Sequence, residues 1–216
     1  MKRTLVAACL LFFVTVACGA GGSSSGGKAI VIAAPTYPTG WSELDVSASH
    51  FKLGLPDAWP YVRVNAKYRE ADLAAASKRS GTTATVFQGA LAVSTGYALL
   101  AAKPDISALL ITATIAASTS DRVDKVASDF VKGFSDSSGG NYTQGATTNR
   151  KIAVGAAIQT KGTISSGNTT LDVLIVTYLE PTSQRPRTAF SFVFLTNNLA
   201  TYSPNFDTIL DTFRTV

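Results

Sequence analysis

Residues 187–196 read RTAFSFVFLT, and their pattern indicates how this chain is layered. Side chains of an extended segment alternate between two faces, so Phe190, Phe192 and Phe194 share one of them. The residues between them form the opposite face, which is also mostly apolar: Ala189, Ser191, Val193 and Leu195. A strand that is apolar on both faces needs cover on both sides. The stretch therefore predicts a central strand with helices above and below it.

The phenylalanine face has two interpretations. It is core beneath a covering helix, or it is the wall of an apolar groove that holds a lipid or acyl chain. Trp59 is the fourth candidate residue for such a groove, because a large apolar ring there could belong to the core or to a surface patch. The sequence leaves both interpretations open.

The residues after this strand predict a helix that could cover one of its faces. Residues 203–216 read SPNFDTILDTFRTV, in which Phe206, Ile209, Leu210 and Phe213 fall at helical spacing on one face. Ser203 is the expected N-cap, and Pro204 suits the first helical position. We therefore predict a terminal helix whose apolar stripe faces the sheet.

The same patterns recur toward the N-terminus. Helical composition or an apolar stripe predicts helices over 69–80, 82–96 and 118–134. Apolar or alternating runs predict strands over 51–55, 97–102, 106–117, 150–160, 169–179 and 187–196. The later strands follow one another with short connections. The fold class predicted is therefore α+β: a central, mainly antiparallel β-sheet flanked by helices on both faces.

The first 27 residues have a different character. Lys2 and Arg3 precede an apolar run over 5–17 that is shorter than the roughly 20 residues of a membrane-spanning helix. The run ends in TVAC at Cys18, and glycine and serine follow. This junction resembles a bacterial lipobox, although Thr15 replaces the usual branched aliphatic residue. Two acyl chains on a cysteine suffice for stable anchoring, and a Gly/Ser segment is a flexible tether.

These observations predict three segments. Residues 1–17 are a lipoprotein signal peptide, residues 18–48 are the lipidated Cys18 with a Gly/Ser/Pro-rich linker, and residues 49–216 are the folded domain. The alternatives are an ordinary cleaved signal with a free cysteine, or an uncleaved anchor. The apolar segment over 28–34 is left unassigned, since it could be a strand of the domain.

Composition argues against several classes of partner and site. The formal charge of +5 falls to about +3 once Lys2 and Arg3 leave with the signal, and no polybasic run is present. We therefore expect no nucleic-acid partner. The two cysteines lie at positions 9 and 18, which leaves no thiol in the domain for a disulfide or a metal. His50 is the single histidine and has no second histidine beside which to bind a metal. We expect no cofactor, no metal and no catalytic residue.

The order of these pieces resembles the PsbP-like superfamily, most closely its LpqN/LpqT type of actinobacterial lipoprotein. The resemblance rests on FKLGLPDAWP (51–60), ADLAAASKRS (71–80), GYALLAAKPD (96–105) and the final TFR. Ala58 departs from the glycine that often precedes this tryptophan, which bears on the tightness of the turn. The resemblance implies an antiparallel sheet with flanking helices, and members that are mostly non-enzymatic adaptors, assembly factors or envelope lipoproteins.

We therefore expect a lipid-anchored, extracytoplasmic lipoprotein of the bacterial cell envelope, held at the cell membrane through Cys18. It would bind an envelope protein or lipid and catalyse nothing. Two alternatives remain: an envelope-associated hydrolase, or a carrier of a lipid or glycolipid in an apolar groove at Trp59, Phe190, Phe192 and Phe194.

Overall fold

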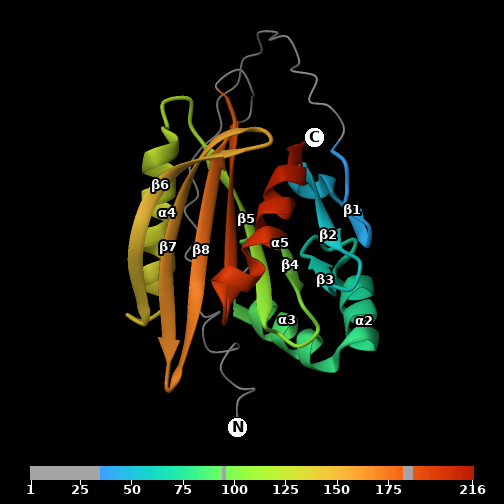
Figure 1. Ribbon diagram of the computed structural model, residues 1–216. Helices are drawn as coiled ribbons and strands as arrows, with labels where there is room; N and C mark the ends of the chain where they lie inside the picture. Colours follow the sequence, from blue (N-terminus) through green and yellow to red (C-terminus); the bar gives the residue numbers. More distant parts are fainter. Residues whose placement is uncertain (1–34, 94–95, 182–186) are drawn as a thin grey trace.

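The computed structural model describes residues 35–93, 96–181 and 187–216 (Figure 1). The N-terminal part contains β1 (Trp41–Val46), η1 (Ser47–Ser49, a 3₁₀ turn), β2 (Phe51–Pro56) and β3 (Tyr61–Arg63). The middle contains α2 (Arg69–Arg79), α3 (Gly81–Val93), β4 (Tyr97–Ala102), β5 (Ala108–Ala117) and α4 (Val123–Ser137). The remainder contains β6 (Tyr142–Ile152), β7 (Gly155–Ser166), β8 (Thr169–Leu179), β9 (Arg187–Thr196), α5 (Leu199–Thr212) and β10 (Arg214–Thr215).

A seven-stranded sheet forms the centre, in the order β3-β4-β5-β9-β8-β7-β6, and every neighbouring pair is antiparallel. β9 lies between β5 and β8 and is buried along most of its length, as its two apolar faces require. A second, three-stranded sheet has the order β1-β2-β10. The predicted α+β class with a mainly antiparallel sheet is confirmed.

The two faces of the large sheet are covered by different elements. Leu110, Leu174 and Phe192 lie on the face that packs against α5 and the three-stranded sheet. Leu109, Ile175 and Val193, their alternating neighbours, lie on the opposite face, against α3 and α4. α2 packs beside α3 and next to β3 at the edge of the same layer (Figure 1). Helices therefore cover both faces, as predicted.

The terminal helix differs from the prediction at both ends. It ends at Thr212, because Phe213 has an extended backbone and Arg214–Thr215 pair with β2 as β10. α5 begins at Leu199 rather than near Ser203, and Pro204 lies inside it. Asn198 is the N-cap, and its Oδ1 accepts a hydrogen bond from the Thr201 N–H at 3.0 Å. Asparagine is as good an N-cap as serine, so Asn198 and Ser203 are both possible caps. The helix begins after Asn198, which makes it about one turn longer. The predicted stripe is correct, because Phe206, Ile209, Leu210 and Phe213 are all buried.

β1, β3 and most of β6 lie where no strand was predicted. β1 occupies 41–46, inside the expected linker, and pairs with β2 from Trp41↔Pro56 to Val46↔Phe51, so the folded domain begins before residue 49. β6 begins eight residues before the predicted strand over 150–160 and includes 150–152 of it, and a hairpin turn at 153–154 separates these residues from β7. β1 and β6 have few buried side chains, so hydrophobic periodicity does not reveal them.

Candidate functional site

A surface hollow of about 260 Å³ lies beside Trp59, between the hairpin of β1 and β2 and the end of α2. Leu44, Leu55, Pro56 and Trp59 provide its apolar lining. Ser42, Glu43, Asp57, Tyr61 and Arg79 add polar groups. Tyr61 and Arg79 also line a smaller hollow of about 60 Å³ against α2, so the two cavities share one rim.

The LPDAW turn shapes this hollow. Pro56 ends β2, and the Trp59 N–H donates to the Pro56 carbonyl at 2.9 Å, which closes a tight turn. Ala58 fits there without strain, since His50 and Ile106 are the only described non-glycine residues with a positive φ. The Asp57 N–H donates to the Gly40 carbonyl at 2.8 Å, which fixes the turn to the start of β1.

Polar contacts hold the rim in place. Ser42 Oγ donates to Asp57 Oδ1 at 2.5 Å, and Arg79 Nη1 donates to the Asp57 carbonyl at 2.6 Å. Arg79 makes no other hydrogen bond with a described residue, so the rest of its exposed guanidinium faces solvent. Glu43 accepts a hydrogen bond from the Tyr37 hydroxyl, which lowers the pKa of Glu43 and keeps it ionised. The rim therefore carries fixed charges of both signs.

An ion pair joins α2 to β3 beside the smaller hollow. Asp72 of α2 is buried and holds Arg63 of β3 through two hydrogen bonds, Nε to Oδ2 at 2.8 Å and Nη2 to Oδ1 at 3.0 Å. The hydrogen bonds that Arg63 donates to the Asp72 carboxylate raise the pKa of Arg63. The Arg63 guanidinium also lies 3.9 Å from the centre of the Tyr68 ring. These contacts join α2, which carries Arg79, to β3, which carries Tyr61.

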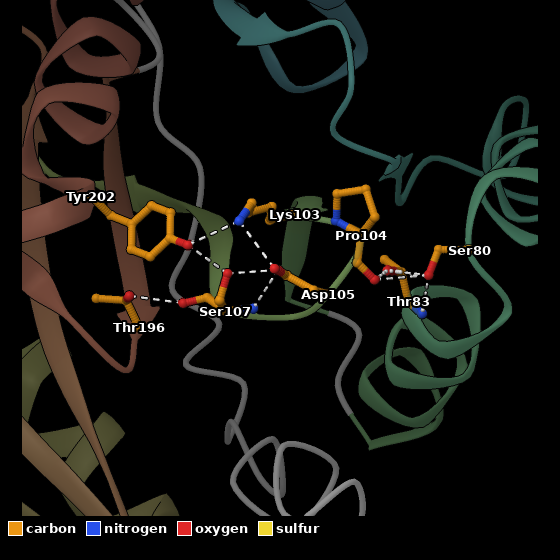
Figure 2. Close-up of polar contacts among 8 residues, drawn as sticks. All are labelled: Ser80, Thr83, Lys103, Pro104, Asp105, Ser107, Thr196 and Tyr202. Atoms are coloured by element: carbon orange, nitrogen blue, oxygen red, sulfur yellow. Dashed lines mark hydrogen bonds and ion pairs between the residues drawn. The ribbon is translucent and has the colours of Figure 1, made fainter.

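A second polar cluster lies on the loop between β4 and β5 (Figure 2). Lys103 Nζ contacts Asp105 Oδ2 at 3.0 Å and the Tyr202 hydroxyl at 3.1 Å, and the Ser107 hydroxyl lies 2.6 Å from the Tyr202 hydroxyl. A serine hydroxyl that contacts a tyrosine and, through it, a lysine resembles a serine nucleophile with an adjacent base. We therefore examine the hydrolase alternative at this cluster.

The protonation states of this cluster oppose such chemistry. The hydrogen bond to Asp105 raises the pKa of Lys103, so its amine stays protonated. Burial disfavours the charged form of Asp105, but hydrogen bonds from Ser107 and Lys103 outweigh it and lower its pKa to about 2. A protonated amine cannot accept the serine proton, and a carboxylate with so low a pKa is a weak base. The cluster instead ties the loop to α5 through Tyr202.

The same loop is also fixed to α3. The Ser80 hydroxyl donates to the Pro104 carbonyl at 2.9 Å, and the Thr83 hydroxyl lies 3.0 Å from Ser80 Oγ (Figure 2). Thr196 Oγ1 donates to the Ser107 carbonyl at 2.8 Å. The loop therefore links α3 on one face of the sheet to α5 on the other, which is a structural role for the cluster.

The structure separates the four residues proposed for an apolar groove. Trp59 borders the hollow, although only 4% of it is exposed. Phe190 and Phe192 pack against Phe213, with ring centres 5.2 and 4.9 Å apart, and Phe194 stacks on Phe206 at 4.4 Å. The three phenylalanines are buried beneath α5 and Phe213. This packing agrees with the interpretation of this face as core. Cys18 lies outside the described residues.

Sequence reasoning did not find Arg79, Asp57 or Ser42. Each is exposed and polar, and the three come from separate elements that only the fold brings together. Within the described ranges, no group of three or more His, Cys, Asp and Glu side chains is arranged to hold a metal ion. In the same ranges, the helices are too short or too polar for any of them to cross a membrane.

Comparison with known proteins adds one finding. No protein-family model and no curated protein sequence matches the chain. Its structure is similar to the solution structure of cyanobacterial PsbP (CyanoP) from Synechocystis sp. PCC 6803, with a TM-score of 0.55 and 14% sequence identity. The likeness covers 90% of this chain and 98% of that one. The chain therefore has a PsbP-like fold.

Proposed function

We propose that this protein is a lipid-anchored binding or adaptor lipoprotein on the extracytoplasmic face of the bacterial cell membrane, of the LpqN/LpqT type and without enzymatic activity. Its partner is an envelope protein that inserts a side chain into the hollow beside Trp59. The anchor is proposed from the sequence, in which a signal-like apolar run stops at Cys18 and a Gly/Ser tether follows. The binding role is proposed from the hollow.

The observation that carries the binding role is the composition of the hollow. Trp, Tyr and Arg are the residues that contribute most to protein–protein interfaces. Tyr61 and Arg79 lie at the rim of this hollow, and the buried Trp59 lies behind them in its lining. Small-molecule pockets usually measure about 300–1,000 Å³, so a hollow of about 260 Å³ suits one inserted side chain better than a lipid. The charged rim supplies hydrogen bonds that orient the partner.

Photo-cross-linking in intact cells tests the binding role. A benzoylphenylalanine at position 42 replaces an exposed residue of the rim, and the same probe at position 125 on α4 is the control. We expect one discrete protein adduct from position 42 that is lost in Arg79→Glu and retained in Lys78→Glu. An adduct of equal yield from both positions, or an adduct to lipid found by mass spectrometry, would contradict a protein partner at this hollow.

Membrane fractionation tests the anchor separately. Cys18→Ala should release the protein from membranes or leave its precursor uncleaved, because the acyl acceptor is gone. Cys9→Ala is the matched control, since position 9 lies inside the expected signal and should change neither fractionation nor migration. If Cys18→Ala fractionates and migrates like the wild type, the lipoprotein assignment is wrong.

A further inference from the structure

β6 is an edge strand with an open side. It ends the seven-stranded sheet and, among the described residues, pairs only with β7 (Figure 1). Both of its ends are fixed: the Tyr142 ring packs edge-on against Phe134 at 5.1 Å, and Ile152 is buried. Residues 143–149 and Lys151 between them are exposed. The edge is therefore held extended before any partner arrives, which lowers the entropic cost of binding.

The pairing register shows which backbone groups are open. Ile152 pairs with Gly155 across a two-residue turn, and the residues that flank such a turn exchange both backbone hydrogen bonds. Bonded and non-bonded pairs alternate along an antiparallel ladder, so Arg150 and Thr148 also bond to β7. The N–H and C=O groups of Thr147, Asn149 and Lys151 therefore point away from the sheet.

The open edge is positively charged on both faces. Lys151 lies on the face of the sheet that α4 covers elsewhere, whereas Arg150 and Lys161 lie on the α5 face. Neither β6 nor β7 contains an Asp or Glu. Arg150 is bound to Asp207 of α5 at 2.7 Å, but Lys151 and Lys161 are exposed and form no ion pair with a described residue.

We propose that residues 147–151 of β6 bind an acidic, extended segment of a partner protein as an added antiparallel or parallel strand. The open N–H and C=O groups supply the backbone ladder, and Lys151 and Lys161 select carboxylates on either face of the added strand. The opposite edge of the sheet offers no equivalent, because β3 has only three residues and packs against α2. This site is independent of the hollow beside Trp59.

A second copy of this chain fits the edge less well than an acidic segment. Self-pairing would bring together two strands that each carry Arg150 and Lys151 and no carboxylate. Lysine on an edge strand is a common means by which proteins prevent such self-association. Charge complementarity therefore favours an acidic partner.

Fluorescence anisotropy with the full chain in detergent tests the proposal. The probe is a fluorescein-labelled nine-residue peptide with two adjacent central glutamates between valines and threonines. The control peptide has two lysines in place of the glutamates. We expect the wild type to bind the glutamate peptide at least about tenfold more tightly than the lysine peptide, and Lys151→Glu to reverse this order.

Asn149→Pro separates strand addition from simple charge attraction. Proline removes an N–H that points away from the sheet, so the fold, checked by circular dichroism and the urea midpoint, should be retained. Binding of the glutamate peptide should fall at least about tenfold, whereas Lys78→Glu on α2 should leave it unchanged. Absence of binding by the wild type at millimolar peptide would overturn the proposal. So would unchanged binding by Asn149→Pro, or a dimer in sedimentation that this variant abolishes.

Discussion

Phe213 joins the two sheets to the terminal helix. Its ring centre lies within 6 Å of those of Phe51, Tyr178, Phe190 and Phe192, so one side chain contacts β2, β8 and β9. Gly54 on β2 allows this close approach, because a Cβ there would lie 2.9 Å from Thr212 Oγ1 at the end of α5. The aromatic face of β9 is thus filled by residues of the same chain.

Phe213→Ala should lower the free energy of unfolding by about 3–5 kcal/mol, the usual cost of deleting a buried ring. Asp211→Ala, on the exposed face of α5, should change the free energy of unfolding by no more than about 0.5 kcal/mol. Urea midpoints of both variants beside the wild type check this. A small loss of stability in Phe213→Ala would mean that the ring lines an open groove.

Asp105 should make stability depend on pH. Its pKa is lowered to about 2 in the folded chain, from about 3.9 in an unfolded one. The ionised carboxylate therefore stabilises the fold above about pH 4, and this contribution is lost as the pH falls toward 2. Because 59% of the side chain is exposed, solvent screening limits the effect to about 1 kcal/mol. Urea unfolding of Asp105→Asn and the wild type should differ at pH 6 and converge near pH 2, and a constant difference would contradict this assignment.

α5 shows how a helix boundary depends on its surroundings. Its start is fixed by Asn198, which caps the first turn, and by the Leu199 N–H, which donates to Asp172 of β8 at 2.9 Å. Both contacts satisfy N–H groups that have no partner inside a helix. Pro204 is tolerated inside the helix, because the stripe from Phe206 to Phe213 is held by the core.

Asn198→Ala should cost about 0.5–2 kcal/mol, the usual effect of removing an N-cap side chain. Asn197→Ala is the matched control, because Asn197 is also exposed and its side chain makes no hydrogen bond with a described residue. Thermal unfolding of the two variants would distinguish them. Equal melting temperatures would indicate that the helix begins nearer Ser203.

At the level of the whole molecule, the small sheet and the large sheet share one core. Leu44 and Val46 of β1 belong to the same buried cluster as Phe190 and Phe206. β1 therefore contributes side chains to this core, although it lies in a segment with the composition of a linker.

A chain of residues 35–216 should fold alone and unfold in one cooperative urea transition, since it contains every strand of the two sheets that the structure describes. A chain of residues 49–216 lacks β1 and exposes the edge of β2, so its urea midpoint should be clearly lower. Circular dichroism during urea titration checks both. Equal midpoints would show that β1 is dispensable.

The sequence by itself determined the α+β class, the bounds of β8 and β9, and the stripe of α5. These features follow from side chains buried against the sheet, and burial leaves a period in the sequence that can be read locally. Only the tertiary structure decided the rest: that β1 and β6 are strands, that α5 begins at Leu199 behind the Asn198 cap, and that Trp59 and Arg79 share a hollow. An edge strand is defined by its neighbour and a hollow by the elements around it, and both arise from long-range packing that leaves no period along the chain.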